Sequence, residues 1–278
     1  MATEAIASEG ILAAADGTKL AYRAWPKPQA TITFAVVHGL GDHAGRYAAF
    51  ADAMGARGMA TFALDLRGHG KSAGQRGHVD SWSQWTDDFA GFVRHVEGLV
   101  QSEVVPLGHS FGGAVLLSTV LDGKLANSKR FIVSSPALKV KVAVPEWKIS
   151  LGRVSSTVMP RLALDNEVHA DWLSRIPEVV EAYRTDPLVH PKISARLYTE
   201  WLRATQDILD RATQIREPFL ILAGADDRLI DPAGSVELSK RTLGCSELQL
   251  LPGRYHEPFN DLGSEEVFGI IERWLKGS

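Results

Sequence analysis

The chain alternates short apolar runs with longer stretches in which apolar residues recur every three or four positions. Near-continuous apolar runs are typical of strands covered on both faces, as in a parallel sheet. The expected strands are residues 32–37, 59–64, 104–107, 131–133, 219–223 and 248–251. The helical pattern predicts helices over 46–57, 82–100, 112–121, 232–243 and 265–276. This alternation predicts an α/β fold with a mostly parallel sheet and helices on both faces.

Two segments depart from the alternation. Residues 10–25 predict a β-hairpin, because two β-like pieces flank the turn sequence Ala-Asp-Gly-Thr at 15–18. Residues 133–219 show no convincing strand, and helical patterns lie near 166–184 and 190–212. A gap of this length in a compact domain indicates an inserted subdomain or lid. We therefore expect a core formed by 1–135 and 217–278, with a helical cap over 136–216 inserted after the sixth strand.

Composition narrows the class of protein. The 278 residues are 45% hydrophobic and 23% charged, with a net charge of −3, which gives no electrostatic case for binding nucleic acid. One cysteine, Cys245, rules out an internal disulfide framework and a cysteine-based zinc site. The first residues lack the basic start and apolar core of a signal peptide, and no apolar run reaches the roughly 18 residues of a membrane span. A cytoplasmic protein, soluble or peripheral at a membrane, is expected.

The most informative stretch is Gly108-His109-Ser110-Phe111-Gly112, between a predicted strand and a predicted helix. A G-x-S-x-G sequence in this context is typical of a nucleophile elbow, in which a sharp turn exposes the serine oxygen. The N-terminus of the following helix would favour negative charge at the same place. The alternative is that Ser110 caps the helix behind a glycine turn. The motif alone does not decide between them.

A nucleophilic serine needs a base, and in this architecture the chain order is serine, acid, histidine. His169 and His190 fall in the expected insertion, where a solvated position is the simpler assignment. His256 follows the last predicted strand, at the carboxyl edge where active sites of open α/β sheets gather. We therefore expect His256 to be the base.

The acid should follow the preceding strand, where the chain contains Asp226, Asp227 and Asp231. Asp231 precedes Pro232 and is expected to be the N-cap of the next helix. Asp226 and Asp227 are adjacent, so their side chains point in different directions. Spacing alone does not choose between these two carboxylates.

An oxyanion hole requires backbone N–H groups directed at the developing negative charge. The first is expected from Phe111, the residue after the serine. The second is expected from Leu40, because the first long strand ends in His38-Gly39-Leu40-Gly41 and glycines allow close backbone approach. His69 and His78, in Arg-Gly-His contexts, lack the further ligands at defined spacing that a metal site needs. No metal or organic cofactor is expected.

Several motifs together resemble the α/β-hydrolase superfamily and, within it, the monoacylglycerol lipase and lysophospholipase branch. They are 38–47 (HGLGDHAGRY), 65–72 (DLRGHGKS), 76–79 (RGHV), 108–113 (GHSFGG), 186–188 (DPL), 224–229 (GADDRL) and 256–260 (HEPFN). In that family the acid is the third residue after the glycine, which is Asp227 here. The resemblance implies a Ser110–His256–Asp227 triad and a mobile helical cap. The cap region carries the least similarity.

The function implied is hydrolysis of a monoacylglycerol or a similar single-chain lipid ester through an acyl-enzyme. Two alternatives use the same triad, a short-chain carboxylesterase and a lysophospholipase. A third is a catalytically silent ligand-binding protein on this scaffold, since fold alone does not establish function.

Residues 137–164 combine basic and apolar side chains. Five Lys or Arg residues stand against one acid, Glu146, and apolar residues such as Trp147 and Val158 lie between them. A basic amphipathic segment can lie in a membrane interface, which suits a lipid substrate. The alternative is a lid segment with its apolar side on the protein body and its basic residues in water.

Overall fold

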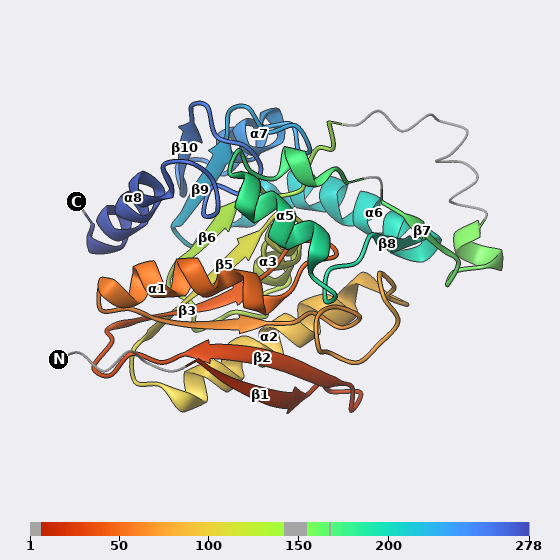
Figure 1. The fold of residues 1–278 in the computed structure, drawn as a ribbon, viewed down its shortest axis with the longest axis horizontal. Helices are drawn as coiled ribbons and strands as arrows, with labels where there is room; N and C mark the ends of the chain where they lie inside the picture. Colours follow the sequence, from red (N-terminus) through yellow and green to blue (C-terminus); the bar gives the residue numbers. More distant parts are fainter. Residues whose placement is uncertain (1–6, 142–154, 167, 278) are drawn as a thin grey trace.

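The computed structural model describes residues 7–141, 155–166 and 168–277. Within these residues, an eight-stranded sheet runs in the order β1-β2-β4-β3-β5-β6-β9-β10 (Figure 1). Its strands are β1 (Ser8–Ala13), β2 (Lys19–Trp25), β3 (Ile32–Val37), β4 (Ala60–Leu64), β5 (Glu103–His109), β6 (Phe131–Ser134), β9 (Phe219–Gly224) and β10 (Ser246–Leu251). The hairpin β1–β2 and the pair β2–β4 are antiparallel, and the other pairs are parallel. The prediction of a mostly parallel sheet is confirmed.

Helices cover both faces of the sheet, as the sequence predicts. They are α1 (Ala48–Ala56), α2 (Trp82–Leu99), α3 (Phe111–Leu121), α7 (Ala233–Arg241) and α8 (Ser264–Lys276), with a 3₁₀ turn η1 (Ala44–Tyr47) before α1. On one face, Phe50 of α1 and Phe268 of α8 join a cluster with Phe34 and Val36 of β3. On the other, α2 and α3 pack on the alternate residues of β3, Ala35 and Val37. Because both of their faces are buried, the inner strands β3 and β9 are nearly apolar throughout, whereas the edge strand β10 keeps polar residues.

The segment between β6 and β9 contains the expected insertion, and its described part lies over one end of the sheet (Figure 1). Its helices with both ends described are α5 (Pro177–Thr185) and α6 (Ala195–Arg211), with 3₁₀ turns η2 (Ala170–Trp172) and η3 (Ala212–Gln214). The helix expected over 166–184 is therefore shorter and later than predicted. It begins at a proline, the residue best suited to a first helical position.

The expectation of no strand in this interval is wrong. β7 (Ala163–Asp165) and β8 (Lys192–Ser194) form a two-stranded antiparallel sheet of their own. Each has three residues, too few for an alternating pattern to be recognised in the sequence. Their backbone pairing joins segments about 30 residues apart.

Candidate active site

Ser110 lies on the turn between β5 and α3 with a left-handed backbone, φ 53° and ψ −119°. This conformation is strained for a residue with a side chain and is stable only where the surroundings enforce it. The surroundings require glycines: a Cβ on Gly108 would lie 2.5 Å from the Gly112 carbonyl oxygen, and one on Gly112 would lie 2.4 Å from that of Val37. The two glycines let β5, α3 and β3 approach closely enough to form the turn.

The side chain of Ser110 does not cap the helix. It makes no capping hydrogen bond to α3, and its Oγ lies 2.8 Å from Nε2 of His256. On the other side of the imidazole, Nδ1 lies 2.7 Å from Oδ2 of Asp227. Since a carboxylate only accepts, Nδ1–H donates to Asp227, and Nε2 is left to accept the Ser110 hydroxyl proton. All three side chains are buried.

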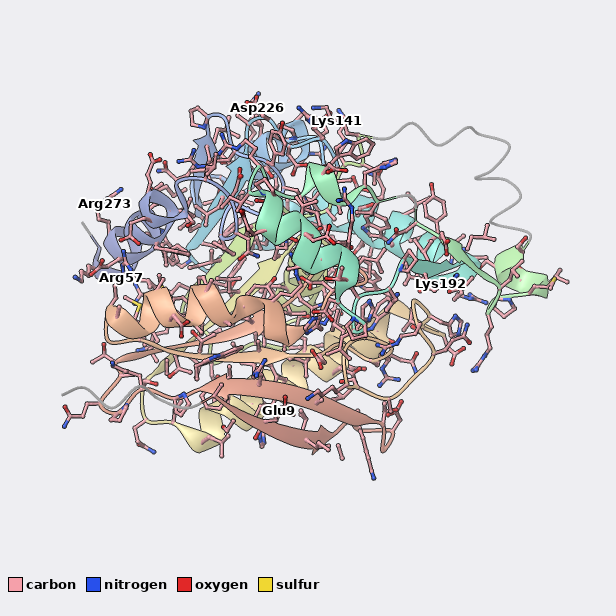
Figure 2. All side chains as sticks on the ribbon, viewed as in Figure 1. Glu9, Arg57, Lys141, Lys192, Asp226 and Arg273 are labelled. Atoms are coloured by element: carbon pink, nitrogen blue, oxygen red, sulfur yellow. The ribbon has the colours of Figure 1, made fainter. Side chains whose placement is uncertain are left out.

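Of the two adjacent aspartates, the structure brings Asp227 to the histidine. Asp227 follows β9, and its second oxygen, Oδ1, accepts hydrogen bonds from the N–H groups of Leu229 and Ile230 at 2.8 and 3.0 Å. These bonds orient the carboxylate toward His256. Asp226 is exposed and lies at the rim of the molecule (Figure 2). The N-cap of α7 is Pro232, so the expectation that Asp231 is the N-cap is wrong by one residue. The Asp231 side chain still accepts from the N–H of Ala233, the first residue of the helix.

The charges of the site favour an imidazole that readily takes a proton. Burial by itself lowers the pKa of His256, but the Asp227 charge and hydrogen bond, followed by the charges of Glu257 and Asp42, outweigh it and raise the pKa. Burial would raise the pKa of Asp227, yet His256 and the two backbone donors hold it below its usual value. The pair is therefore arranged to stabilise an imidazolium next to a carboxylate.

The residues expected to supply the two oxyanion N–H groups are Phe111, which follows this serine in the chain, and Leu40, whose neighbour Gly39 packs against it. Phe111 begins α3, and Gly39, next to Leu40, approaches so closely that a Cβ on it would lie 3.4 Å from Ser110 Cβ. Among the described residues, neither the Leu40 nor the Phe111 N–H donates to a backbone carbonyl. N–H groups in the first turn of a helix have no partner inside the helix, so that of Phe111 is available to a ligand.

A buried ion pair next to the histidine escaped prediction from the sequence. Both terminal nitrogens of Arg46 donate to the carboxylate of Glu257, each over 2.7 Å, and Asp42 lies 3.3 Å from the same guanidinium. Glu257 directly follows His256, and Arg46 lies near the end of the 38–47 segment. Charged residues are almost never buried without partners, but no local pattern joins two positions 211 residues apart.

The expectation that His190 is solvated is wrong. It is buried, and its Nε2 donates to the carbonyl of Gly68 over 3.1 Å, while His69 lies 4.7 Å from it, ring centre to ring centre. His169 is exposed, as expected, and packs on Trp172. Within the described part of the chain, no group of three His, Cys, Asp or Glu residues could hold a metal ion.

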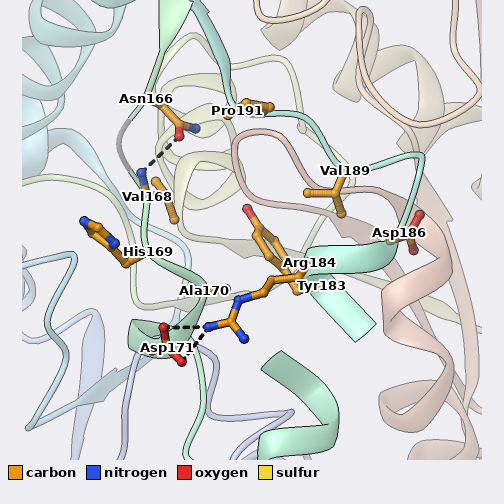
Figure 3. A pocket seen from close by; sticks show the side chains of 10 residues that line it. All are labelled: Asn166, Val168, His169, Ala170, Asp171, Tyr183, Arg184, Asp186, Val189 and Pro191. Atoms are coloured by element: carbon orange, nitrogen blue, oxygen red, sulfur yellow. Dashed lines mark hydrogen bonds and ion pairs between the residues drawn. The ribbon is translucent and has the colours of Figure 1, made fainter. Parts of the chain in front are cut away.

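A polar pocket of about 420 Å³ lies in the insertion (Figure 3). Its lining residues are Asn166, Val168, His169, Ala170, Asp171, Tyr183, Arg184, Asp186, Val189 and Pro191, with Arg184 paired to Asp171. The pocket is separate from the triad, but two of its residues contact the loop that carries Leu40. Asp186 pairs with His43 at 2.8 Å, and the ring of Tyr183 stacks 4.8 Å from the Arg46 guanidinium.

The sheet order, the helices on both faces and the serine on a strained strand-to-helix turn define an α/β hydrolase. The sequence model of the family described as serine aminopeptidase, S33, matches residues 26–263. The chain belongs to this family of α/β hydrolases and is a hydrolase.

Known relatives agree with this assignment. A monoacylglycerol lipase of Mycolicibacterium smegmatis is 32% identical over 278 residues, which cover 96% of this chain and 96% of the relative. An uncharacterized abhydrolase domain-containing protein of Dictyostelium discoideum is also 32% identical, and the match spans 28% of that longer protein. The crystal structure of a Paleococcus ferrophilus monoacylglycerol lipase aligns with a TM-score of 0.81 at 28% identity, covering 97% of this chain and 98% of that one. No helix among the described residues is both long and apolar enough to cross a membrane.

Proposed function

We propose that the protein is a serine carboxylic ester hydrolase acting on monoacylglycerols or similar single-chain lipid esters. The observation that carries the proposal is the hydrogen-bonded chain from Ser110 Oγ through His256 to Asp227, at 2.8 and 2.7 Å. A ligand-binding protein would have no use for a strained, buried serine paired with an oriented imidazole. The catalytically silent alternative is therefore disfavoured.

In the proposed mechanism, Ser110 Oγ attacks the ester carbonyl carbon while His256 takes its proton. The carbonyl oxygen becomes an oxyanion bound by the N–H groups of Leu40 and Phe111. His256 then protonates the leaving alcohol as its C–O bond breaks, and the acyl group stays on Ser110. Water, deprotonated by the same imidazole, then attacks the acyl carbon. The bond from that carbon to Ser110 Oγ breaks, the fatty acid leaves, and the imidazolium returns its proton to Oγ. Asp227 keeps Nδ1 protonated and stabilises the imidazolium throughout.

The names of the relatives support the lipid substrate. The M. smegmatis and P. ferrophilus relatives are both named monoacylglycerol lipases. We infer that the insertion, 136–216, acts as a cap on a core formed by 1–135 and 217–278.

Hydrolysis of p-nitrophenyl esters from acetyl to palmitoyl, beside 1-monooleoylglycerol and a lysophosphatidylcholine, tests this function. We expect strong turnover of monooleoylglycerol that Ser110→Ala abolishes, together with fluorophosphonate labelling of the wild type alone. Ser118→Ala, a serine on the same helix, is the matched control and should keep activity. Activity confined to short esters would favour the carboxylesterase alternative, and preference for lysophosphatidylcholine the lysophospholipase.

We further propose transient contact of the insertion with a membrane surface. Val158, Met159, Leu162 and Leu164 are between 44 and 73% exposed, and the exposed Arg161 lies among them. Apolar side chains with nearby cations suit an anionic interface. The central part of the basic segment, 142–154 with Trp147, lies outside the described residues. Co-sedimentation with anionic vesicles should weaken in the double variant Val158→Ser/Met159→Ser. It should remain at the wild-type level in Leu243→Ser, a control because Leu243 is as exposed as Val158. Equal loss in both variants would count against the insertion.

A further inference from the structure

The ion pair between Arg46 and Glu257 is nearly sealed from solvent. The two side chains are 10 and 6% exposed, and the aromatic face of Tyr183 covers the guanidinium. The Glu257 carboxylate also accepts from the Asn260 side chain over 3.0 Å. Because the guanidinium, the Tyr183 ring and the Asn260 amide already occupy the contacts of this pair, it has little hydrogen-bonding capacity left for a substrate.

This pair joins the segments that carry the proposed machinery. Arg46 belongs to η1, which continues the loop of Leu40, and Glu257 follows His256 in the chain. The N–H of Glu257 donates to the carbonyl of Leu173 in the insertion over 2.9 Å. Three segments far apart in the sequence therefore meet at one ion pair.

We propose that Arg46 and Glu257 are positioning residues, which hold the Leu40 loop and His256 in their working geometry relative to Ser110. The proposal rests on the triad proposed above. Desolvation makes a buried ion pair a poor stabiliser compared with apolar residues of similar size, so fold stability alone is a weak reason for one here. A forked guanidinium–carboxylate pair, in contrast, fixes both distance and orientation between two loops.

The charges around His256 make this role measurable. The titratable and charged groups facing the imidazole are Asp227 after β9, His109 at the end of β5, Glu257 on its own loop, and Asp42 with Arg46 from the opposite loop. The Glu257 carboxylate favours the imidazolium and so contributes to the raised pKa of His256. Removing that charge should therefore lower the pKa of His256, whereas another cation in place of Arg46 should leave it nearly unchanged.

Steady-state kinetics of Glu257→Gln and Arg46→Lys test the proposal, with enzyme concentration set by fluorophosphonate titration. In Glu257→Gln we expect kcat/KM to fall by ~10- to 100-fold, mainly in kcat, because small misplacements of reacting groups cost about that much. The acid limb of the kcat/KM–pH profile reports the pKa of the base in the free enzyme, and in this variant it should move to lower pH. Arg46→Lys keeps the charge but loses the fork, so kcat should fall without movement of the acid limb.

Glu103→Gln is the matched control. Glu103 also makes a forked pair, less buried, with Nε and Nη2 of Arg130, at 2.9 Å for both bonds. It lies at the start of β5, about 20 Å along the strand from Ser110. The Glu103→Gln substitution should lower the melting temperature and leave kcat and the acid limb unchanged. The proposal is overturned if folded Glu257→Gln has the kcat and the acid limb of the wild type. It is also overturned if Glu103→Gln loses as much kcat as Glu257→Gln.

If Glu257→Gln does not fold, Arg46→Lys decides: a fall in kcat supports positioning, and wild-type kcat overturns it. Ser110→Ala separates the two proposals. If it keeps full activity, the triad itself fails; if it is inactive while Glu257→Gln behaves as wild type, only the positioning role fails.

Discussion

The indole N–H of Trp201, on α6 of the insertion, donates to the carbonyl of Ala137 over 3.0 Å. The N–H of Ala137 in turn donates to the carbonyl of Ser110 over 2.9 Å. The Trp201 ring also packs edge-on against Phe111, 5.8 Å between ring centres. The insertion thus contacts both the proposed nucleophile and the residue expected to supply an oxyanion N–H.

We predict that Trp201→Phe lowers the free energy of unfolding by about 1–3 kcal/mol, because it leaves the Ala137 carbonyl buried without a donor. It should also reduce kcat/KM severalfold by loosening the turn at Ser110. Urea unfolding and ester kinetics measure the two effects. Trp274→Phe, on α8 and away from the serine, should leave kcat/KM unchanged. Equal kinetic losses in both variants would contradict the link.

The adjacent carboxylates offer a sharp test of the acid. Asp227→Asn should lower kcat by ~10³- to 10⁴-fold, because an amide no longer holds the imidazole in the required tautomer. Asp226→Asn should remain within about twofold of wild type, since Asp226 is exposed and Nδ1 of His256 is hydrogen-bonded to Asp227 instead. Comparison of kcat for the two variants at one pH is sufficient. A large loss in Asp226→Asn would reverse the assignment.

Position 112 has no room for a side chain. A Cβ there would lie 2.4 Å from the carbonyl oxygen of Val37, which is backbone and cannot move away cheaply. We therefore expect Gly112→Ala to destabilise the fold by more than about 2 kcal/mol and to abolish activity. Gly98→Ala, in α2 with no atom within 4 Å of the new Cβ, should be neutral or stabilise by about 0.5–1 kcal/mol. Thermal unfolding distinguishes the two outcomes.

Buried histidines predict acid sensitivity of the fold. Burial lowers the pKa of His38 and His109 to about 3, and that of His190 to about 4. The unfolded chain takes up protons near pH 6.5 that the folded chain does not, so stability falls as pH drops below that value. Each of His38 and His109 contributes a slope of up to about 1.4 kcal/mol per pH unit.

Urea unfolding between about pH 7.5 and pH 5 measures this dependence. His190→Gln should show a shallower slope than wild type, because it removes one group whose pKa is lowered by burial. His169→Gln, an exposed histidine of the same insertion, should keep the wild-type slope. Stability that stays constant between pH 7 and pH 5 would contradict the prediction.

The sequence by itself determined the core elements, and often their bounds within one or two residues. β3 was predicted with its observed bounds, Ile32–Val37, and α2 was predicted within one residue of its observed bounds, Trp82–Leu99. Their signals are local: an uninterrupted apolar run for a strand covered on both faces, and apolar residues at helical spacing for an amphipathic helix. The turn at Ser110 was also predictable, because Gly108 and Gly112 mark it within five residues.

Only the tertiary structure decided which groups meet. The chain order selected His256, but the hydrogen bonds from Leu229 and Ile230 orient Asp227 rather than its neighbour. The pairing of Arg46 with Glu257, the burial of His190 and the short β7–β8 sheet have no local signal. Each depends on segments between about 30 and 211 residues apart that the fold brings together. Hydrophobic periodicity specifies which face of an element is buried, and the packing of those faces then determines which side chains become neighbours.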